Sequence, residues 1–405
     1  MNRDNYLIMV STFCHGIGLG LQIYFAIIRA GILINPILSA LMMGVYFATA
    51  SIASMIFGKL SDHVKKRKIF GILGNILCGV VYIQYFFITD MIFFLLFSFF
   101  AGITTSLVSA TIPALYSELD PHTEKGMLMS WYNISNSAGW AVSVFLGEIF
   151  FIFMQNFIYF LFGFVTISAA LFLIPIREKH LEKNRNESEI KTNNSHFDKI
   201  KPFLIFIAII VAFRHCTSQG TISSLLPNFL VLELQASEFV RGFIYSFNTF
   251  LQVGLMIPIG RLVDKHGRRN VLILGVSFSM IAAFGYSLCI TPWQVLPFQI
   301  CVAIGWTCLI NSASAYIIDI TTENDRAKGV GLLNAGLFIG GSAGPFLASL
   351  SLTIFYGSFQ LSFIFLSLFA IPGIILCLLL KEDKENHVYQ IFSKKSKIIE
   401  SEIEQ

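Results

Sequence analysis

The chain has 405 residues, of which 55% are hydrophobic and 13% charged, and its formal net charge is +4. Soluble domains carry about a quarter of their residues as charges, so this composition excludes a water-soluble globular protein. The mean hydropathy of +0.71 indicates an α-helical membrane protein instead. In lipid a helix satisfies its own backbone hydrogen bonds, and it needs roughly 20 apolar residues to cross the bilayer.

Apolar stretches of this length recur along the whole chain. The first is too long for a signal-peptide core and lacks a cleavage-like site, so we interpret it as a retained helix. In chain order we predict twelve spans, at residues 6–28, 37–60, 69–89, 91–117, 126–153, 156–176, 202–230, 239–262, 270–290, 293–318, 327–354 and 358–380.

One long polar segment interrupts these spans, and it lies between the sixth and the seventh. Its mixed charge and its asparagines are typical of a flexible linker. We therefore predict four parts: an N-terminal six-helix bundle over 1–176, a linker over 177–201, a C-terminal six-helix bundle over 202–380 and a tail over 381–405.

Lysine and arginine gather in alternate loops, at residues 59–68, 177–201, 261–269, 326–328 and 381–397. The positive-inside rule then predicts a multi-pass protein of the cell membrane with both termini, the linker and the tail in the cytoplasm. Because the basic residues are spread over loops that flank lipid, topology accounts for the net charge, and we expect no nucleic-acid partner.

The seven cysteines all lie inside predicted spans and show no CxxC spacing. This pattern argues against a zinc site or a disulfide framework, and we expect no metal and no cofactor. The sequence also lacks GxSxG, GxxxxGK[ST] and HExxH motifs, so we expect that the protein is not an enzyme. Without a phosphate-binding loop, the expected energy source is an ion gradient.

The two halves of the chain match at positions about two hundred residues apart. The matched pairs are Phe13 and Phe213, His15 and His215, Gly20 and Gly220, Gly58-x-Leu60-x-Asp62 and Gly260-x-Leu262-x-Asp264, Glu118 and Asp319, and Lys125-Gly126 and Lys328-Gly329. Several matches in the same order indicate a duplicated unit. Helical membrane proteins built from repeats are commonly alternating-access transporters.

With this repeat, the sequence resembles the major facilitator superfamily, whose loop between helices two and three reads Gly-x-Leu-x-Asp-Arg/Lys-x-Gly-Arg-Arg/Lys. The second half carries the motif whole, as GRLVDKHGRR from Gly260 to Arg269. In the first half His63 replaces the basic residue and Lys65 the second glycine. The candidate gating residues are Gly58, Asp62, Arg67, Gly260, Asp264, Gly267, Arg268 and Arg269.

The resemblance implies an all-α fold of two pseudo-symmetric six-helix bundles. It also implies that Asp62 faces the start of span eleven and Asp264 the start of span five, which together latch the cytoplasmic side. Small residues such as Gly58 and Gly260 let helices approach closely, and a helix N-terminus favours a carboxylate. The alternative is that these aspartates are ordinary charges beside the membrane.

Span eleven contains Gly331, Gly340 and Gly344-Pro345. This spacing resembles the glycine-proline signature that drug/proton antiporters of the superfamily carry on helix five. Span five has only Gly139-Trp140 at that place, and span four has no arginine before Gly102. The glycines of span eleven are equally explained as close-packing positions beside a proline kink.

Ionisable residues in the hydrocarbon core are costly and are therefore candidates for substrate binding or coupling. They are His15 on span one, Arg214 and His215 on span seven and Glu148 on span five. We expect His15 and Arg214 to point into a central cavity, with Arg214 binding either the substrate or Glu148. Histidine titrates near neutral pH, so each histidine is either a proton carrier or a packing residue. Arg29 and Arg241 fall near outer helix ends, where their side chains can snorkel, so we expect them to be structural.

These features lead to three hypotheses. The first is a monomeric secondary transporter in membrane lipid that exports a small amphipathic or drug-like compound, coupled to protons. The second is uptake or exchange of an organic anion that Arg214 clamps. The third is a receptor on the same fold that transports nothing.

Overall fold

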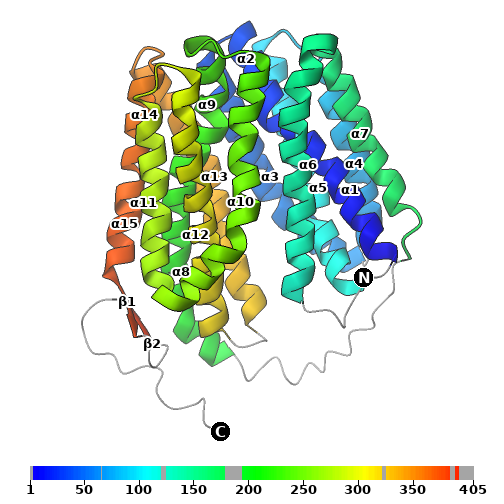
Figure 1. Cartoon of the computed structure of the whole chain (residues 1–405). Coiled ribbons are helices and arrows are strands. Elements are labelled where there is room, and N and C mark those ends of the chain that lie inside the picture. Colours follow the sequence, from blue (N-terminus) through cyan, green and yellow to red (C-terminus); the bar gives the residue numbers. More distant parts are fainter. Residues whose placement is uncertain are drawn as a thin grey trace.

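The computed structural model describes residues 3–64, 66–119, 125–177, 194–321, 325–383 and 388–391. Long helices run side by side along one axis, and the described chain begins and ends at the same end of the molecule (Figure 1). We call this the terminal end and the opposite one the far end. The described residues form an all-helical fold apart from one short pair of strands.

Most of the predicted linker lies outside the described residues, and the helices before it form one bundle, the N-terminal bundle. Its helices are α1 (Arg3–Gly20), η1 (Leu21–Phe25), α2 (Ala26–Leu33), α3 (Pro36–Val64), α4 (Arg67–Gln84), α5 (Met91–Leu119), α6 (Lys125–Met154), η2 (Gln155–Phe157) and α7 (Ile158–Leu173). Of these, α1, η1 and α2 follow one another as a continuous helical run from the terminal end to the far end (Figure 1).

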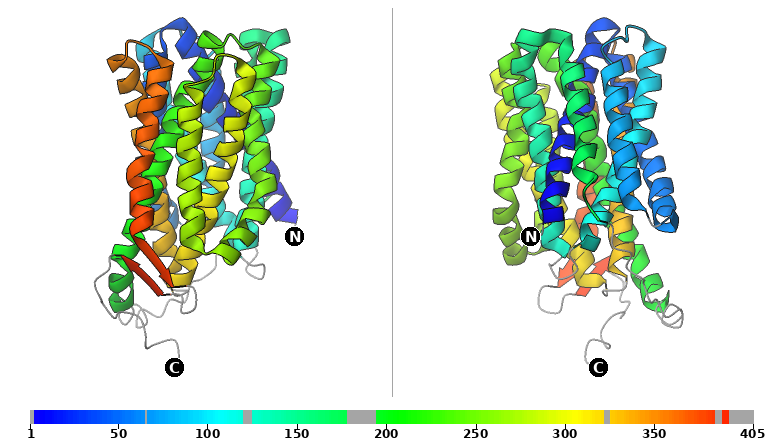
Figure 2. Two further views of the ribbon diagram at one scale, coloured as in Figure 1. Left: turned by 60° about the vertical axis from the view of Figure 1, so that its left-hand side comes forward. Right: turned by 90° about the vertical axis from the view of Figure 1, so that its right-hand side faces the viewer.

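The helices from Asn194 onward, which begin inside the predicted linker, form the C-terminal bundle. Its helices are α8 (Asn194–Ser218), η3 (Gln219–Leu225), α9 (Leu226–Asn228), η4 (Phe229–Glu233), α10 (Glu238–His266), α11 (Arg268–Tyr286), η5 (Pro292–Val295), α12 (Leu296–Ile320), α13 (Arg326–Ile354), α14 (Phe359–Leu368) and α15 (Ala370–Leu379). The antiparallel strands β1 (Leu380–Asp383) and β2 (Val388–Ile391) follow at the terminal end, with Leu380 paired to Ile391 (Figure 2).

Ten helical segments of the described chain are long and apolar enough to cross a membrane, so the predicted count of twelve is not reached by this measure. One of the ten, Trp131–Leu173, contains most of α6 and all of α7, which a break at Gln155 (φ 47°) separates. The expected third span is α4, which is less apolar because it begins with Arg67 and Lys68 and contains Asn75.

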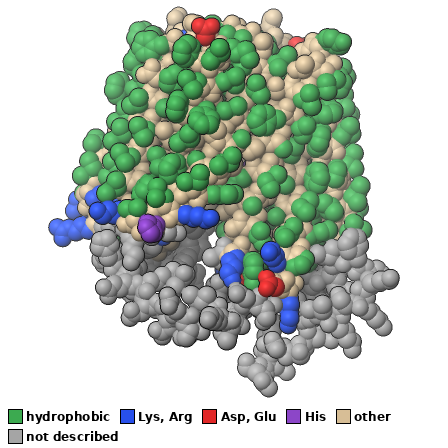
Figure 3. Space-filling view, turned by 180° about the vertical axis from the view of Figure 1, so that it is seen from behind, with side chains coloured by type: hydrophobic (Ala, Val, Ile, Leu, Met, Phe, Trp, Pro, Cys, Tyr) green, Lys and Arg blue, Asp and Glu red, His purple; other side chains and the backbone are tan. Residues whose placement is uncertain are grey.

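The face of the molecule seen in Figure 3 is covered with apolar side chains, while lysine and arginine gather toward the terminal end. Ile257 and Phe153, for example, are 70% and 79% exposed. A lipid-facing surface has this character, because hydrocarbon solvates apolar side chains and not charges. The chain is an integral membrane protein.

Within each bundle, a pair of helices packs closely through glycines, and the two pairs are equivalent in the repeat. A methyl group on Gly139 of α6 would lie 2.1 Å from the carbonyl oxygen of Phe13 in α1, and one on Gly340 of α13 would lie 2.2 Å from that of Ala212 in α8. These contacts leave no room for any side chain. Gly340 and Gly344 of the predicted span eleven are therefore close-packing positions in this conformation.

The first long helical run of each bundle contains a π-helical stretch at the same place. The stretches are η1 (Leu21–Phe25) and η3 (Gln219–Leu225). A π turn holds one residue more than an α turn and frequently occurs at functional sites. Both stretches lie next to the pocket described below.

Candidate functional site

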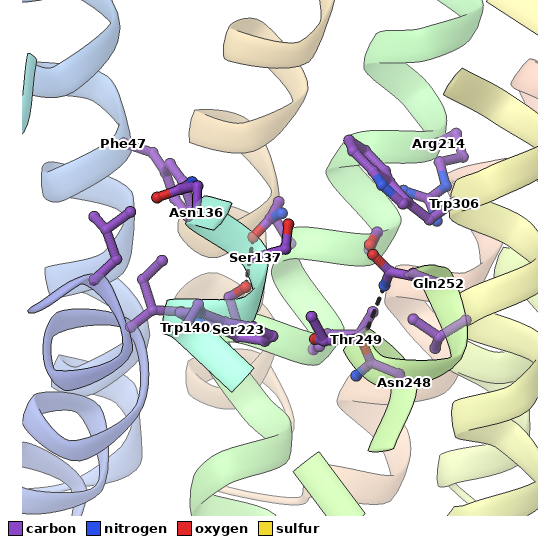
Figure 4. A pocket seen from close by; sticks show the side chains of 16 residues that line it. Phe47, Asn136, Ser137, Trp140, Arg214, Ser223, Asn248, Thr249, Gln252 and Trp306 are labelled. Carbon is purple, nitrogen blue, oxygen red and sulfur yellow. Dashed lines mark hydrogen bonds between the residues drawn. The ribbon is translucent and has the colours of Figure 1, made fainter. Parts of the chain in front are cut away.

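A pocket of about 280 Å³ lies between the two bundles, midway along the helices (Figure 4). Both bundles contribute to its walls, from α1, η1, α3 and α6 on one side and from α8, η3, α10 and α12 on the other. Its lining residues are Leu19, Ile23, Phe47, Asn136, Ser137, Trp140, Arg214, Ser218, Gln219, Ile222, Ser223, Asn248, Thr249, Gln252, Val302 and Trp306.

Aromatic rings from both bundles frame this pocket. Phe47 and Trp140 come from the N-terminal bundle and Trp306 from the C-terminal bundle (Figure 4). Such rings offer apolar surface with few rotatable bonds, and an indole also carries one hydrogen-bond donor. Both walls can therefore hold an apolar or aromatic group.

Amide side chains supply the polar part of the wall. Gln252 donates to the Oδ1 of Asn248 over 3.0 Å (Figure 4). Asn248 in turn donates to Gln299 over 2.9 Å. The Oδ1 of Asn136 and the Nε1 of Trp140 are buried and have no hydrogen-bond partner among the described residues. Buried polar atoms are nearly always satisfied, so these two atoms need partners that the described residues do not supply in this conformation.

Arg214, which lies in α8, is one of the residues that line the pocket. It is 1% exposed. Its Nε donates to the Oγ of Ser279 over 2.8 Å, and its guanidinium carbon lies 5.4 Å from the centre of the Trp306 ring. No carboxylate of the described chain lies within 4.0 Å of it, so the pair with Glu148 considered as an alternative is absent here.

The two candidate histidines lie outside the wall of the pocket. His15 is 2% exposed, and its Nδ1 lies 3.0 Å from the Oδ1 of Asn75 in α4, inside the N-terminal bundle. The expectation that it points into the cavity is therefore not met. His215 is buried next to the pocket, where its ring centre lies 5.7 Å from that of Trp306.

Glu148 pairs with Arg241, an arginine that was expected from the sequence to be structural. The Nε and Nη2 of Arg241 donate to its two carboxylate oxygens over 3.0 and 2.9 Å, and the hydroxyl of Tyr24 donates to the first over 2.7 Å. Glu148 lies in α6 and Arg241 in α10, so this ion pair joins the two bundles. Snorkelling was the wrong expectation for Arg241, because it is 8% exposed and turned toward Glu148.

Further contacts join the bundles at the far end. Asn228 of α9 donates to the Oγ of Ser39 in α3 over 2.6 Å, and the rings of Tyr24 and Tyr245 lie 4.6 Å apart. A methyl group on Gly31 would meet the side chain of Asn228 at 2.1 Å. The molecule is thus closed above the pocket, toward the far end.

The glycines of the loop motif make no such contacts at the terminal end. Nothing lies within 4 Å of a methyl group placed on Gly58 or Gly260, and the same holds for Gly331 of α13, outside the motif. The close helix approach expected at Gly58 and Gly260 is therefore absent from this structure. The bundles are closed at the far end and apart where these glycines lie.

The charged part of the motif is exposed or engaged locally. Asp264 is 78% exposed, and its nearest cation is Arg268 at 4.0 Å. Arg268 pairs with Asp319 over 2.9 Å, while Arg269 donates to the carbonyl groups of Cys377 and Leu378.

Two further motif residues mark the ends of helices. Gly267 has φ 87° and separates α10 from α11, a backbone conformation that favours glycine. Arg67 is the first residue of α4. The Asp62 side chain and residue 65 lie outside the described part, as do the side chains at the start of α6.

Comparisons with known proteins agree with this architecture. The family model of the Major Facilitator Superfamily matches residues 8–214 and again residues 207–401. An uncharacterized MFS-type transporter of Methanocaldococcus jannaschii is 22% identical over 372 residues, which cover 86% of this chain and 92% of that one. Multidrug resistance protein 2 of Bacillus subtilis is 27% identical over 207 residues, or 49% of each chain.

Among solved structures, a bacterial homolog of the human lysosomal transporter Spinster, in an inward-facing and occupied conformation, is similar in fold. Its TM-score is 0.74 at 13% sequence identity, and the match covers 95% of this chain and 97% of that one. At this identity the likeness concerns the fold alone.

Proposed function

The chain belongs to the Major Facilitator Superfamily and is a secondary transporter rather than an enzyme, and we propose that it exports a small amphipathic compound across the cell membrane in exchange for protons. The observation that carries this proposal is the pocket between the bundles, with rings from both sides and unsatisfied polar atoms. Binding at the interface of two repeats is the arrangement that alternating access needs.

The proposed mechanism is a rocking of the two bundles about this pocket. The structure is closed at the far end and separated at the terminal end. With both termini, the linker at 177–201 and the tail at 381–405 in the cytoplasm, this conformation receives its substrate from inside the cell. The opposite conformation would close the terminal end and release the substrate outside.

The loop motif then acts in the opposite conformation. We propose that Gly58 and Gly260 come into helix contact, and that Asp62 and Asp264 reach the starts of α13 and α6, only when the terminal end closes. The exposure of Asp264 and the empty space at both glycines support this assignment, because residues of an open latch have no partners across the interface.

Glu148 is the proposed site of proton coupling. Opening the far end separates it from Arg241, and a carboxylate that loses its guanidinium in an apolar environment is more stable protonated. The pair also lines a second cavity of about 320 Å³ near the far end, together with Arg29 and Glu238. Protons from outside can reach the carboxylate by this route once the bundles part.

The direction of export is supported by the relatives that are named multidrug resistance proteins. The test is uptake by proteoliposomes with an imposed pH gradient, using a panel of neutral, cationic and anionic aromatic compounds. Accumulation of at least one class in inverted vesicles acidified inside supports the proposal. Absence of both transport and counterflow for every class would contradict it and would favour a receptor.

A further inference from the structure

The pocket carries a net positive charge. Among the described residues that line it, none is acidic and Arg214 alone is basic. A guanidinium stays protonated in proteins, so the charge is permanent. An incoming cation would be repelled at this depth, whereas an anion would be attracted.

Nothing resident in the described chain neutralises this charge. The polar contact of Arg214 is the hydroxyl of Ser279, and its other neighbour is the face of Trp306. A neutral hydroxyl and a ring lower the cost of burying a cation, but they do not replace a counter-ion. Buried charges in proteins are normally paired with an opposite charge, and no described residue supplies one to Arg214.

Resting on the proposed function, we propose that the transported compound is an anionic amphiphile whose carboxylate or phosphate binds Arg214 while its apolar body packs between Trp140 and Trp306. Arg214 presents a planar fork of donors that fits such oxyanions. Ser279 is a positioning residue, because its bond to Nε leaves the two terminal nitrogens for the ligand.

In this proposal the uncharged part of the ligand supplies the partners that two polar atoms of the opposite wall lack. The indole Nε1 of Trp140 requires an acceptor and the Oδ1 of Asn136 a donor. Both belong to the N-terminal bundle, whereas Arg214 belongs to the C-terminal bundle. One ligand that reaches all three would tie the bundles together, which is how binding is converted into rocking.

The test compares three probes of nearly the same shape on the purified full-length protein: 2-naphthoate, 2-naphthamide and the 2-naphthylmethylammonium cation. Binding is followed by isothermal calorimetry in detergent. We expect the anion to bind the wild type at least about tenfold more tightly than the amide, and the cation most weakly. Equal or tighter binding of the cation would overturn the proposal without any variant.

The variants assign this preference to one residue. Arg214→Gln should reduce naphthoate binding by about tenfold or more and leave naphthamide binding within about threefold. Arg214→Lys should retain part of the preference, because it keeps the charge and loses the fork. Arg3→Gln at the exposed start of α1 is the matched control and should change the binding of neither ligand. A preference for the anion that survives in Arg214→Gln would overturn the proposal.

The two proposals fail in different ways. Binding of naphthoate that depends on Arg214, with no transport of any compound, would leave the anion site standing and remove the transport function. Transport of a cationic compound that Arg214→Gln does not slow would do the reverse.

Discussion

Glu148 and Arg241 form a two-point ion pair across the boundary between the bundles, with donor-acceptor distances of 3.0 and 2.9 Å and exposures of 1% and 8%. The pair is the strongest polar link that the described far end offers. Replacing one of the two residues by a neutral one leaves the charge of the other buried without this partner.

We therefore expect Glu148→Gln to lower the free energy of unfolding by about 3 kcal/mol, since Arg241 keeps its charge. The double change Glu148→Gln/Arg241→Met should cost less than the single one, because it leaves no buried charge. Thermal unfolding in detergent measures both. Glu238→Gln is the control: its carboxylate lies 3.7 Å from Arg241 and is 40% exposed, so a loss below about 1 kcal/mol is expected. A double variant less stable than Glu148→Gln would contradict the argument.

The coupling role of Glu148 makes a separate prediction. Counterflow exchanges substrate without net proton movement, so Glu148→Gln should retain counterflow. The same variant should lose most of the accumulation that a pH gradient drives in the wild type. Both rates are measured in the same proteoliposomes. Accumulation that still follows the gradient in this variant would assign coupling to another group.

Glycines at the two kinds of position should respond differently to a methyl group. Gly340→Ala pushes against the carbonyl oxygen of Ala212 and should destabilise the protein by about 1–3 kcal/mol. Gly260→Ala meets open space in this conformation and should be neutral or slightly stabilising. Because we place Gly260 in the opposite, closed conformation, we expect its change to slow transport more than it alters thermal stability. Equal thermal shifts for the two variants would contradict this division.

His15 is expected to stabilise the N-terminal bundle. Its hydrogen bond to Asn75 is buried, and His15→Ala leaves the amide without this partner, at a cost of about 1–3 kcal/mol. The dependence of transport on the pH gradient should persist in those molecules that fold. Loss of this dependence with unchanged thermal stability would instead restore His15 as a proton carrier.

The fold class was predictable because hydropathy and helix length are properties of single segments. The apolar stretches and the basic loops each carry their own signal, and the repeated motif identified the family. The count of twelve was less secure, because α4 begins with Arg67 and Lys68 and α6 and α7 adjoin with a short break. A change of direction at Gln155 is a matter of backbone torsion that hydropathy does not record.

The partners of the buried charges were not predictable in the same way. Arg214 and Arg241 both stand beside apolar residues in the sequence. The sequence alone therefore does not show which of them pairs with Glu148. The answer depends on the rotation of α10 against α6 and on the depth of each residue. Arg241 lies in the first turn of α10 and Glu148 in the last two turns of α6, so antiparallel neighbours bring them to one level. The pairing of α6 with α10 was therefore the information that the sequence did not supply.

The π-helical turns of η1 and η3 determine how the helical segments between the pocket and the far end are rotated. One additional residue rotates everything beyond it by about 100°, because each residue of an α-helix advances by that angle. Gly31, packed against Asn228, therefore owes its direction to the π turn that begins at Leu21. Deleting one residue from that stretch would restore a regular spiral and swing α2 away from its partner, while His15 and the rest of α1 kept their places.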